Sequence, residues 1–162
     1  MTPGGEPYLA MEWLEGEDLS APLSGRRPSV DEALSLARRV ASALGEAHDR
    51  GMVHRDIKPA NLFLEHDDVA RAKLLDFGIA RFTGQGRMTQ TGALLGTPGY
   101  MAPEQARGEE GLTPALDIFA LGCVLFEALT GRPAFEGQNM MAVLAKILFT
   151  ELAPVFKDRN GG

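Results

Sequence analysis

The chain has 162 residues, which is enough for one domain with a hydrophobic core and short for two. Its formal net charge of −6, from 16 basic and 22 acidic residues, argues against a protein that binds nucleic-acid phosphates through clustered cations. The single cysteine, Cys123, excludes an intrachain disulfide framework and a cysteine-rich zinc site.

The N-terminal part of the chain gives weak structural signals. Residues 1–7 are rich in proline and glycine and predict a disordered lead-in, without the basic start or apolar stretch of a signal peptide. Residues 8–11 form a short apolar run that is a candidate buried strand. Residues 15–28 are polar, with two glycines and two prolines, and predict a loop with a short helix.

The clearest helix signal begins at Ser29. Ser29 and Glu32 have the spacing of a capping box, in which each satisfies a backbone N–H of the other. Arg50 and Gly51 supply a basic last turn and a left-handed cap, so the helix should end there. The expected apolar stripe between these signals consists of Val30, Ala33, Leu34, Ala37, Val40, Ala41, Leu44 and Ala47.

Two short strands are expected next, at residues 61–64 and 72–75, joined by a polar turn at 65–68. A loop rich in glycine, threonine and proline then runs from residue 78 to about 101. A loop of that length inside a compact domain is usually functional.

Two further helices are expected toward the C-terminus. Residues 114–129 are apolar around most of a helical circumference, which predicts a helix inside the core. Residues 139–150 are amphipathic, and residues 151–162 predict a frayed tail. No stretch approaches the ~18 apolar residues of a membrane span, so we expect no membrane segment and a cytoplasmic location.

The residues that carry chemistry gather in two segments. Residues 54–61, His-Arg-Asp-Ile-Lys-Pro-Ala-Asn, place Asp56, Lys58 and Asn61 in one loop between a helix and a strand. Asp76 directly follows a predicted strand and precedes Phe-Gly, which favours a sharp turn. Carboxylate and amide oxygens suit Mg²⁺, which takes few protein ligands and completes its shell with substrate phosphates. The sequence therefore predicts a magnesium site at Asn61 and Asp76.

These segments resemble the eukaryotic-type serine/threonine protein kinases in the form common in bacteria. Residues 54–61 are similar to the catalytic loop, Asp-Phe-Gly at 76–78 to the metal-binding motif, and Ala-Pro-Glu at 102–104 to the end of the activation segment. The resemblance covers residues 8–150 and implies an α+β, mainly α fold, the large C-terminal lobe of a kinase-like domain with a few short β-strands. It implies ATP-dependent phosphorylation of serine and threonine hydroxyls on protein substrates, with ATP and Mg²⁺ as cofactors.

The resemblance assigns a role to each catalytic position. Asp56 would accept or orient the proton of the substrate hydroxyl, and Lys58 would neutralise charge on the transferred phosphoryl group. Asn61 and Asp76 would hold Mg²⁺ against the phosphates. Asp117, at the start of the helix at 114–129, would bind the backbone of the catalytic loop.

A nucleotide site follows from the same resemblance. Met11 stands at the gatekeeper position of the hinge, and the backbone of Glu12 and Leu14 would pair with adenine. Asp18 falls where family members often bind the ribose, and Phe63 would lie under the adenine ring.

Four residues are implied in regulation and substrate binding. Thr97 would hydrogen-bond near the catalytic aspartate, in the loop that receives the residue after the phosphoacceptor. Arg55 precedes the catalytic aspartate, as in kinases that are switched on by phosphorylation of the activation loop. Thr89 and Thr91 resemble the paired threonines that bacterial relatives autophosphorylate, and a phosphothreonine there would pair with Arg55. A dimer of the full-length protein would serve that autophosphorylation.

Structural roles are expected for the remaining conspicuous side chains. His54 is predicted to be a packed histidine that touches Phe77, whereas His48 and His66 are expected at the surface. Cys123 is predicted to be a small core residue, and a phenylalanine stands at position 119 where many relatives have tryptophan.

The kinase resemblance is incomplete at both ends. A glycine-rich loop, a strand lysine and the last helices of the family do not occur in the sequence, which therefore resembles a kinase lower lobe truncated on both sides. The intact Asp56, Lys58, Asn61 and Asp76 favour the catalytic portion of a protein phosphotransferase. The absent upper lobe favours a non-catalytic kinase-lobe fragment or pseudokinase-like binding module with little ATP turnover. Both interpretations stay open at the level of the sequence.

Overall fold

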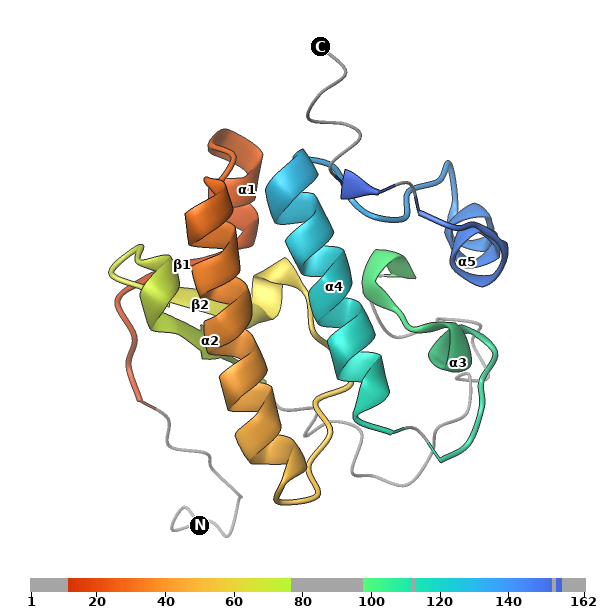
Figure 1. Ribbon diagram of the computed structural model, residues 1–162, viewed down its shortest axis with the longest axis horizontal. Coiled ribbons are helices and arrows are strands. Elements are labelled where there is room, and N and C mark those ends of the chain that lie inside the picture. The colour runs from red at the N-terminus through yellow and green to blue at the C-terminus, as the bar shows by residue number, and fades with distance from the viewer. Residues whose placement is uncertain (1–11, 77–97, 112, 153, 156–162) are drawn as a thin grey trace, which may run out of the picture.

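Two long helices form the centre of the molecule. The computed structural model describes residues 12–76, 98–111, 113–152 and 154–155. Helix α2 (Val30–His48) packs against helix α4 (Ala115–Thr130), and the two run side by side through the fold (Figure 1). A small sheet covers one side of α2, while helices α3 (Pro103–Ala106) and α5 (Met140–Phe149) lie beyond α4 (Figure 1). The expected α+β, mainly helical fold is confirmed.

Helix α2 begins where the capping box predicts. The Glu32 N–H donates to Ser29 Oγ at 3.2 Å, and the Ser29 N–H donates to Glu32 Oε2 at 2.7 Å. The buried face comprises Ala33, Leu36, Val40, Leu44 and Ala47. The predicted stripe was wrong at three positions: Leu34 and Ala41, which it contained, are exposed, and Leu36, which it left out, is buried. The apolar pattern allows either face, and packing against both α4 and the sheet selects the one that contains Leu36.

An ion pair at the start of α2 predicts a dependence of stability on pH. Arg26 donates to both carboxylate oxygens of Glu32, at 3.1 and 2.8 Å, and this pairing together with the Ser29 N–H lowers the Glu32 pKa from its usual 4.5 to about 2. A carboxyl with a lowered pKa in the folded state stabilises the fold above its unfolded pKa and loses that contribution as the pH falls. We expect Glu32→Gln to be less stable than wild type at pH 7, with the difference shrinking between about pH 5 and pH 2. Urea unfolding at a series of pH values measures this, and a difference that stays constant with pH would contradict it.

The sheet has three antiparallel strands in the order β1–β2–β3. Strands β2 (Leu62–Glu65) and β3 (Ala72–Leu74) confirm the expected pair, with Leu62 opposite Leu74. A short 3₁₀ helix, Val69–Arg71, completes their connection after the turn.

Strand β1 (Gly16–Asp18) was not predicted, because residues 15–28 were expected to form a loop and a short helix. The helix is present as α1 (Ser20–Gly25), but the residues before it pair with the edge of β2, Gly16 opposite Glu65. Gly16 has a φ of 138°, and a Cβ there would lie 2.0 Å from the Leu64 carbonyl oxygen. The strand therefore forms through a close backbone approach that only glycine permits, and three residues without apolar alternation give no local signal for it.

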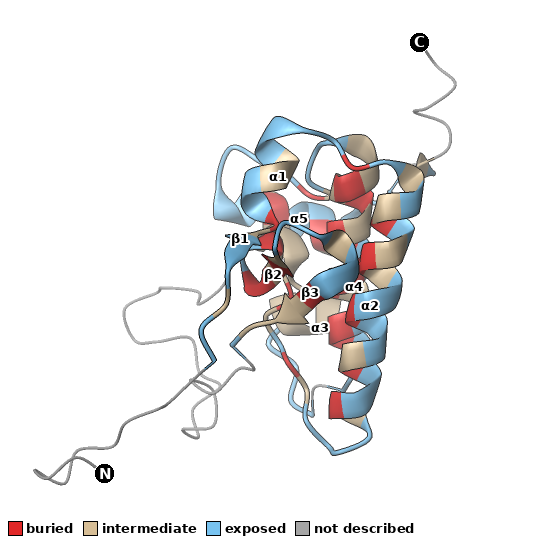
Figure 2. Cartoon of the chain, turned by 90° about the vertical axis from the view of Figure 1, so that its left-hand side faces the viewer, coloured by how far each residue is buried: buried red, intermediate tan, exposed pale blue. Residues whose placement is uncertain are grey.

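Helix α4 separates two hydrophobic cores. Its residues Ala120, Leu121 and Val124 belong to the core shared with α2 and the sheet, whereas Cys123 belongs to a core with α5. The helix ends at Gly131, which adopts the left-handed conformation (φ 75°) of a C-cap. Helix and boundaries confirm the prediction, but Ile118 is 53% exposed, so the helix is not buried on every side (Figure 2).

The C-terminal core is built around α5, which Asn139 caps by accepting the Ala142 N–H at 3.0 Å. Val143 and Ile147 of α5 are buried, as its amphipathic pattern predicts. The core also holds Phe135, whose ring stacks on that of Phe119 with centroids 6.0 Å apart. Phe119 thus has an aromatic packing partner in this core. Residues 151, 152, 154 and 155 lie beyond the end of α5.

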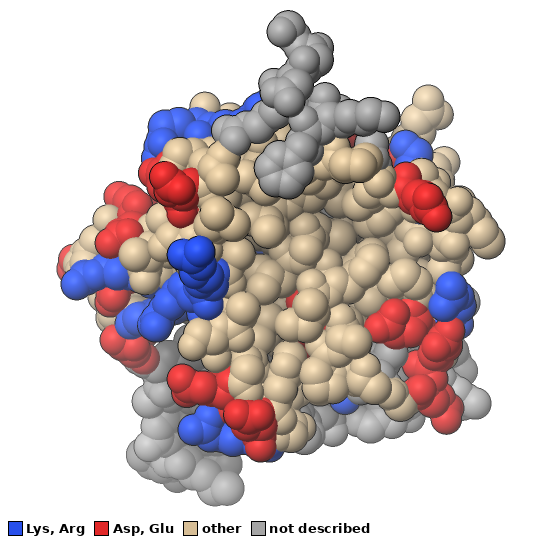
Figure 3. Space-filling model, viewed as in Figure 1, with Lys and Arg blue, Asp and Glu red and all other residues tan. Residues whose placement is uncertain are grey.

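The surface carries charges of both signs. On the face with α2 and α4 toward the viewer, basic and acidic side chains alternate around the rim and uncharged side chains fill the middle (Figure 3). Among the described residues, no helix combines the length and the apolar character that crossing a membrane requires.

Candidate active site

Three polar side chains converge in the loop between α2 and β2. Lys58 Nζ lies 2.9 Å from Asp56 Oδ2, and Asn61 Nδ2 donates to the same oxygen at 3.0 Å. Asn61 Nδ2 also donates to the Asp56 backbone oxygen at 2.7 Å. The Asp56 side chain remains 34% exposed, so solvent or a ligand reaches its carboxylate. The structure therefore brings three of the predicted residues together around one carboxylate.

Local structure explains this convergence. Lys58 has extended backbone, and a 3₁₀ helix (Pro59–Asn61) follows it, with proline at the first position, where its missing N–H costs nothing. The turn carries Asn61 back toward Asp56, and Asn61 is buried, with 7% of its surface exposed. Because the Asn61 nitrogen donates to Asp56, its carbonyl oxygen Oδ1 is the atom that can face a cation.

Asp76 is held next to this loop by the backbone. The Leu75 N–H donates to the Asn61 backbone oxygen at 2.9 Å, which fixes the end of β3 against the loop. Asp76, the next residue, is exposed and has a φ of 53°, in the left-handed region that aspartate tolerates better than most residues. An amide oxygen and a carboxylate at adjacent chain segments form a donor set that fits Mg²⁺.

His54 links Asp56 to the segment before Asp76. Its imidazole is fully buried, accepts the Asp56 N–H at Nδ1 (3.3 Å) and lies 2.9 Å from the Leu75 carbonyl oxygen at Nε2. Because one nitrogen accepts and the other faces a carbonyl, the ring is the neutral tautomer with its proton on Nε2. The predicted structural role is confirmed, while the expected contact with Phe77 lies outside the described residues.

The backbone of the loop is anchored to α4 through Asp117. This carboxylate has no exposed surface, and it accepts the His54 N–H at Oδ2 and the Arg55 N–H at Oδ1, both at 2.8 Å. The anchoring expected of Asp117 is therefore present. Arg55 has a φ of 68°, an unfavourable conformation for a residue with a long side chain, and the bond to Asp117 holds it there.

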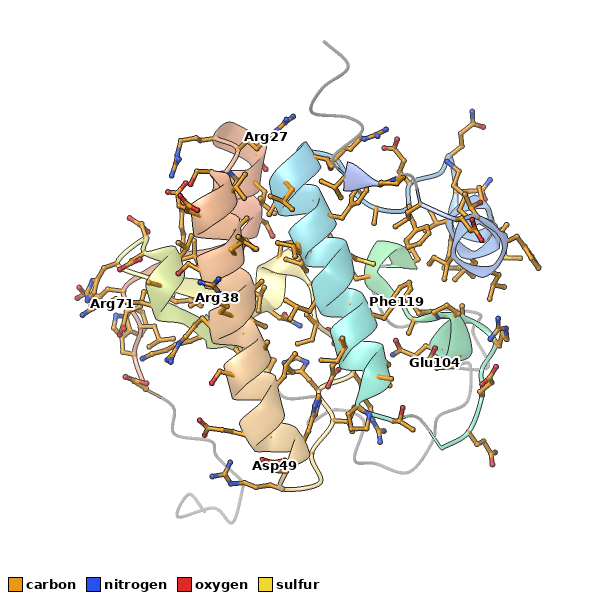
Figure 4. The ribbon with its side chains drawn as sticks, in the orientation of Figure 1. Arg27, Arg38, Asp49, Arg71, Glu104 and Phe119 are labelled. Atoms are coloured by element: carbon orange, nitrogen blue, oxygen red, sulfur yellow. The ribbon has the colours of Figure 1, made fainter. Side chains whose placement is uncertain are left out.

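His48 was expected at the surface, and this prediction was wrong. Its imidazole is only 14% exposed and its Nε2 lies 2.8 Å from Asp117 Oδ2. The signal was present in the sequence, because His48 lies four residues after the buried Leu44 and so continues the same face of α2. Asp49, labelled in Figure 4, marks the end of the helix just beyond it.

The residues predicted to bind a nucleotide lie along the sheet. Asp18 and Phe63 stand opposite each other in the register of β1 and β2. The Asp18 carboxylate accepts the Ser20 N–H at 2.8 Å, just before α1. The Glu12 side chain pairs with Lys73 at 3.1 Å, and Leu14 is half-buried. The fold thus brings together two segments that are about 45 residues apart in the chain.

Four of the predicted residues fall outside the described part of the chain. These are Met11, Thr89, Thr91 and Thr97, and their expected contacts are therefore not part of the observed geometry. Glu104, labelled in Figure 4, is described: it lies in α3 and is half-buried.

A pocket that the sequence did not predict opens beside Lys58. It has a volume of about 330 Å³ and is lined by Ser20, Leu23, Ser24, Lys58, Pro59, Ala60, Tyr100 and Glu127. Tyr100 Oη donates to Glu127 Oε2 at 2.5 Å, and burial together with this carboxylate raises the pKa of Tyr100. Glu127 is the one charged residue among positions 118–130, which is the signal that could have drawn attention to it.

Comparison with known proteins identifies relatives of this arrangement. A family model described as protein kinase domain matches residues 2–158. A probable serine/threonine-protein kinase of Streptomyces coelicolor is 43% identical over 140 residues, 85% of this chain and 20% of that protein. The serine/threonine-protein kinase PrkC of Bacillus subtilis is 42% identical over 89% of this chain and 22% of its own length. PknB of Mycolicibacterium smegmatis, also a serine/threonine-protein kinase, is 41% identical over 88% of this chain and 23% of its own. The chain thus spans about a fifth of the length of these relatives.

Proposed function

This chain belongs to the protein kinase domain family, and from that premise we propose that it carries the phosphoryl-transfer site of a serine/threonine protein kinase. The reaction would move the γ-phosphoryl group of ATP to a serine or threonine hydroxyl of a protein. The observation that carries the proposal is the convergence of Lys58 Nζ and Asn61 Nδ2 on Asp56 Oδ2. The activity is proposed for the natural full-length protein, since the relatives are several times longer than this chain.

The proposed chemistry begins at Asp56. A partly exposed carboxylate can accept the hydrogen bond of the attacking hydroxyl, orient it toward the γ-phosphorus and take up its proton as the new bond forms. Lys58, 2.9 Å from this carboxylate, would place its positive charge beside the transferred group, where negative charge develops. The two side chains thus position nucleophile and phosphoryl group around one point.

We propose Asn61 Oδ1 and the Asp76 carboxylate as the Mg²⁺ ligands of this chain. Both are oxygen donors, and the bond from the Leu75 N–H to the Asn61 backbone oxygen keeps their segments adjacent. When bound, Mg²⁺ would supply positive charge that neutralises the phosphate groups. Asn61 also fixes the Asp56 side chain through its amide nitrogen, so one residue would serve both functions.

The nucleotide base and ribose would lie against the sheet. We propose that the backbone of Glu12 and Leu14 pairs with adenine, with Met11 as gatekeeper and Phe63 beneath the ring. Asp18 would bind the ribose hydroxyls through Oδ2, the carboxylate oxygen that does not accept the Ser20 N–H. The position of Asp18 opposite Phe63 in neighbouring strands supports this arrangement.

Regulation would act on the same loop. We propose that Thr89 and Thr91 are autophosphorylated within a dimer of the full-length protein and that Arg55 receives the phosphate. Thr97 would hydrogen-bond near the reacting hydroxyl, close to Asp56. The left-handed backbone of Arg55, held by Asp117, supports a role in which the arginine side chain must take a defined direction.

The proposal is tested by incubating the natural full-length protein with radiolabelled ATP and a protein substrate, with Mg²⁺ or with excess EDTA. We expect label on serine and threonine in acid hydrolysates when Mg²⁺ is present, and none with EDTA. Absence of transfer at every Mg²⁺ concentration tried would contradict the proposal. That result would favour the alternative, a non-catalytic kinase-lobe module.

A further inference from the structure

His48 and Asp117 form a buried connection between the two long helices. His48 is the last residue of α2 and Asp117 lies in the first turn of α4. The carboxylate has only acceptors, so the imidazole Nε2 must be the donor of the 2.8 Å contact with Oδ2. Oδ2 therefore receives two donors, the His48 ring and the His54 N–H, while Oδ1 receives the Arg55 N–H.

This connection fixes the plane of the Asp117 carboxylate. With the His48 donor present, both oxygens are held in defined directions by groups on two different sides, the end of α2 and the loop. Without it, the donors left to the carboxylate among the described residues would be the two adjacent backbone N–H groups of the loop, and the carboxylate could rotate with them. A buried carboxylate that loses a donor is also less stable in that position, because no solvent replaces the lost bond.

The direction of the carboxylate controls the loop conformation. Arg55 has a left-handed φ of 68°, which is unfavourable for a residue other than glycine, and the bond from its N–H to Asp117 Oδ1 supports this conformation, together with the Gln105 side chain, which donates to the Arg55 carbonyl oxygen at 3.3 Å. Asp56 is the next residue, so a change at Arg55 would displace its carboxylate from Lys58 and Asn61. His48 is thus connected to Asp56 through its hydrogen bond to Asp117 and through Arg55, whose N–H binds the same carboxylate.

We infer that His48 is a positioning residue for phosphoryl transfer, acting through Asp117 on the backbone conformation at Arg55 and so on the direction of the Asp56 carboxylate. The kinetic part of this inference rests on the proposed function, whereas its structural part does not. A small displacement of a reacting group lowers the rate of the chemical step without weakening substrate binding. The inference therefore concerns kcat and the loop, not the affinity for ATP.

The test compares three variants of the natural full-length protein. His48→Leu removes the donor and keeps an apolar side chain of similar size, whereas His48→Gln retains an N–H donor. Val40→Ala is the matched control, because Val40 is buried on the same helix but has no bond to the loop. We expect His48→Leu to lower kcat by about 10- to 100-fold with an unchanged KM for ATP, and both other variants to stay within about threefold of wild type.

Hydrogen–deuterium exchange of the peptides that cover residues 52–60 provides the second measurement. We expect His48→Leu to speed exchange at the His54 and Arg55 amides by about tenfold or more, and His48→Gln and Val40→Ala to leave it unchanged. Unchanged exchange in His48→Leu would overturn the inference. Equal losses of kcat and of protection from exchange in Val40→Ala would also overturn it, because they would show a general loss of stability. If wild type transfers no phosphate, the proposed function fails, and the exchange data still decide the inference.

Discussion

Replacing Asp56 by asparagine is expected to lower kcat of the natural full-length protein by about 10³-fold, with little change in the KM for ATP. Asparagine has nearly the same shape, and its oxygen can still accept hydrogen bonds from Lys58 Nζ and Asn61 Nδ2. It cannot take up the proton of the attacking hydroxyl, so the loss should fall on the chemical step. Steady-state kinetics with ATP and a protein substrate measures both parameters.

The matched control for this variant is Asp49→Asn. Asp49 is exposed at the end of α2, so its replacement by asparagine removes the same charge at a position outside the loop. It should keep kcat within about twofold of wild type, because a surface charge outside the site has little effect on a rate. A loss of less than tenfold in Asp56→Asn would assign Asp56 a structural role and leave another group as the proton acceptor.

The helices of this fold could be predicted because their signals are local. The capping box of Ser29 and Glu32, the left-handed cap at Gly131 and the cap at Asn139 each mark a boundary within a few residues of sequence. Strand β1 could not be predicted in this way. Its three residues become a strand only because the edge of β2 is available and Gly16 allows the backbones to approach.

The residues of the candidate site could be predicted from the sequence, but the hydrogen bonds that hold their loop in place could not. Resemblance to a family selected Asp56, Lys58, Asn61 and Asp76, and the structure places the first three around one oxygen. The hydrogen bonds that shape the loop connect Asp117 to His54 and Arg55, which lie 63 and 62 positions earlier in the chain. The expectation that His48 is exposed also missed one of the partners of Asp117. A side chain at the end of an apolar helical face is ambiguous until the neighbouring helix is in place.

The largest effect on stability is expected from Asp117→Ala. This change leaves the His54 and Arg55 N–H groups and the His48 ring without their common acceptor, a carboxylate that has no exposed surface. Unpaired buried donors and a lost buried network together destabilise a domain by about 3–5 kcal/mol. Urea unfolding followed by circular dichroism gives the free energy of unfolding, and the variant should have a strongly reduced midpoint with a similar slope.

Asp117→Asn keeps the volume of the side chain, so it separates the loss of the hydrogen-bond acceptor from the loss of side-chain volume. Its amide keeps one acceptor oxygen but turns an N–H₂ group toward a donor, so we expect a smaller loss of about 2–3 kcal/mol. Asp49→Ala, at an exposed aspartate on the end of α2, should change stability by less than about 0.5 kcal/mol. If Asp117→Ala cost less than about 1 kcal/mol, water would be satisfying the loop amides, and the left-handed conformation of Arg55 would need another support. The free energies of unfolding should therefore increase from Asp117→Ala to Asp117→Asn to wild type, and their differences measure how strongly the loop depends on this one carboxylate.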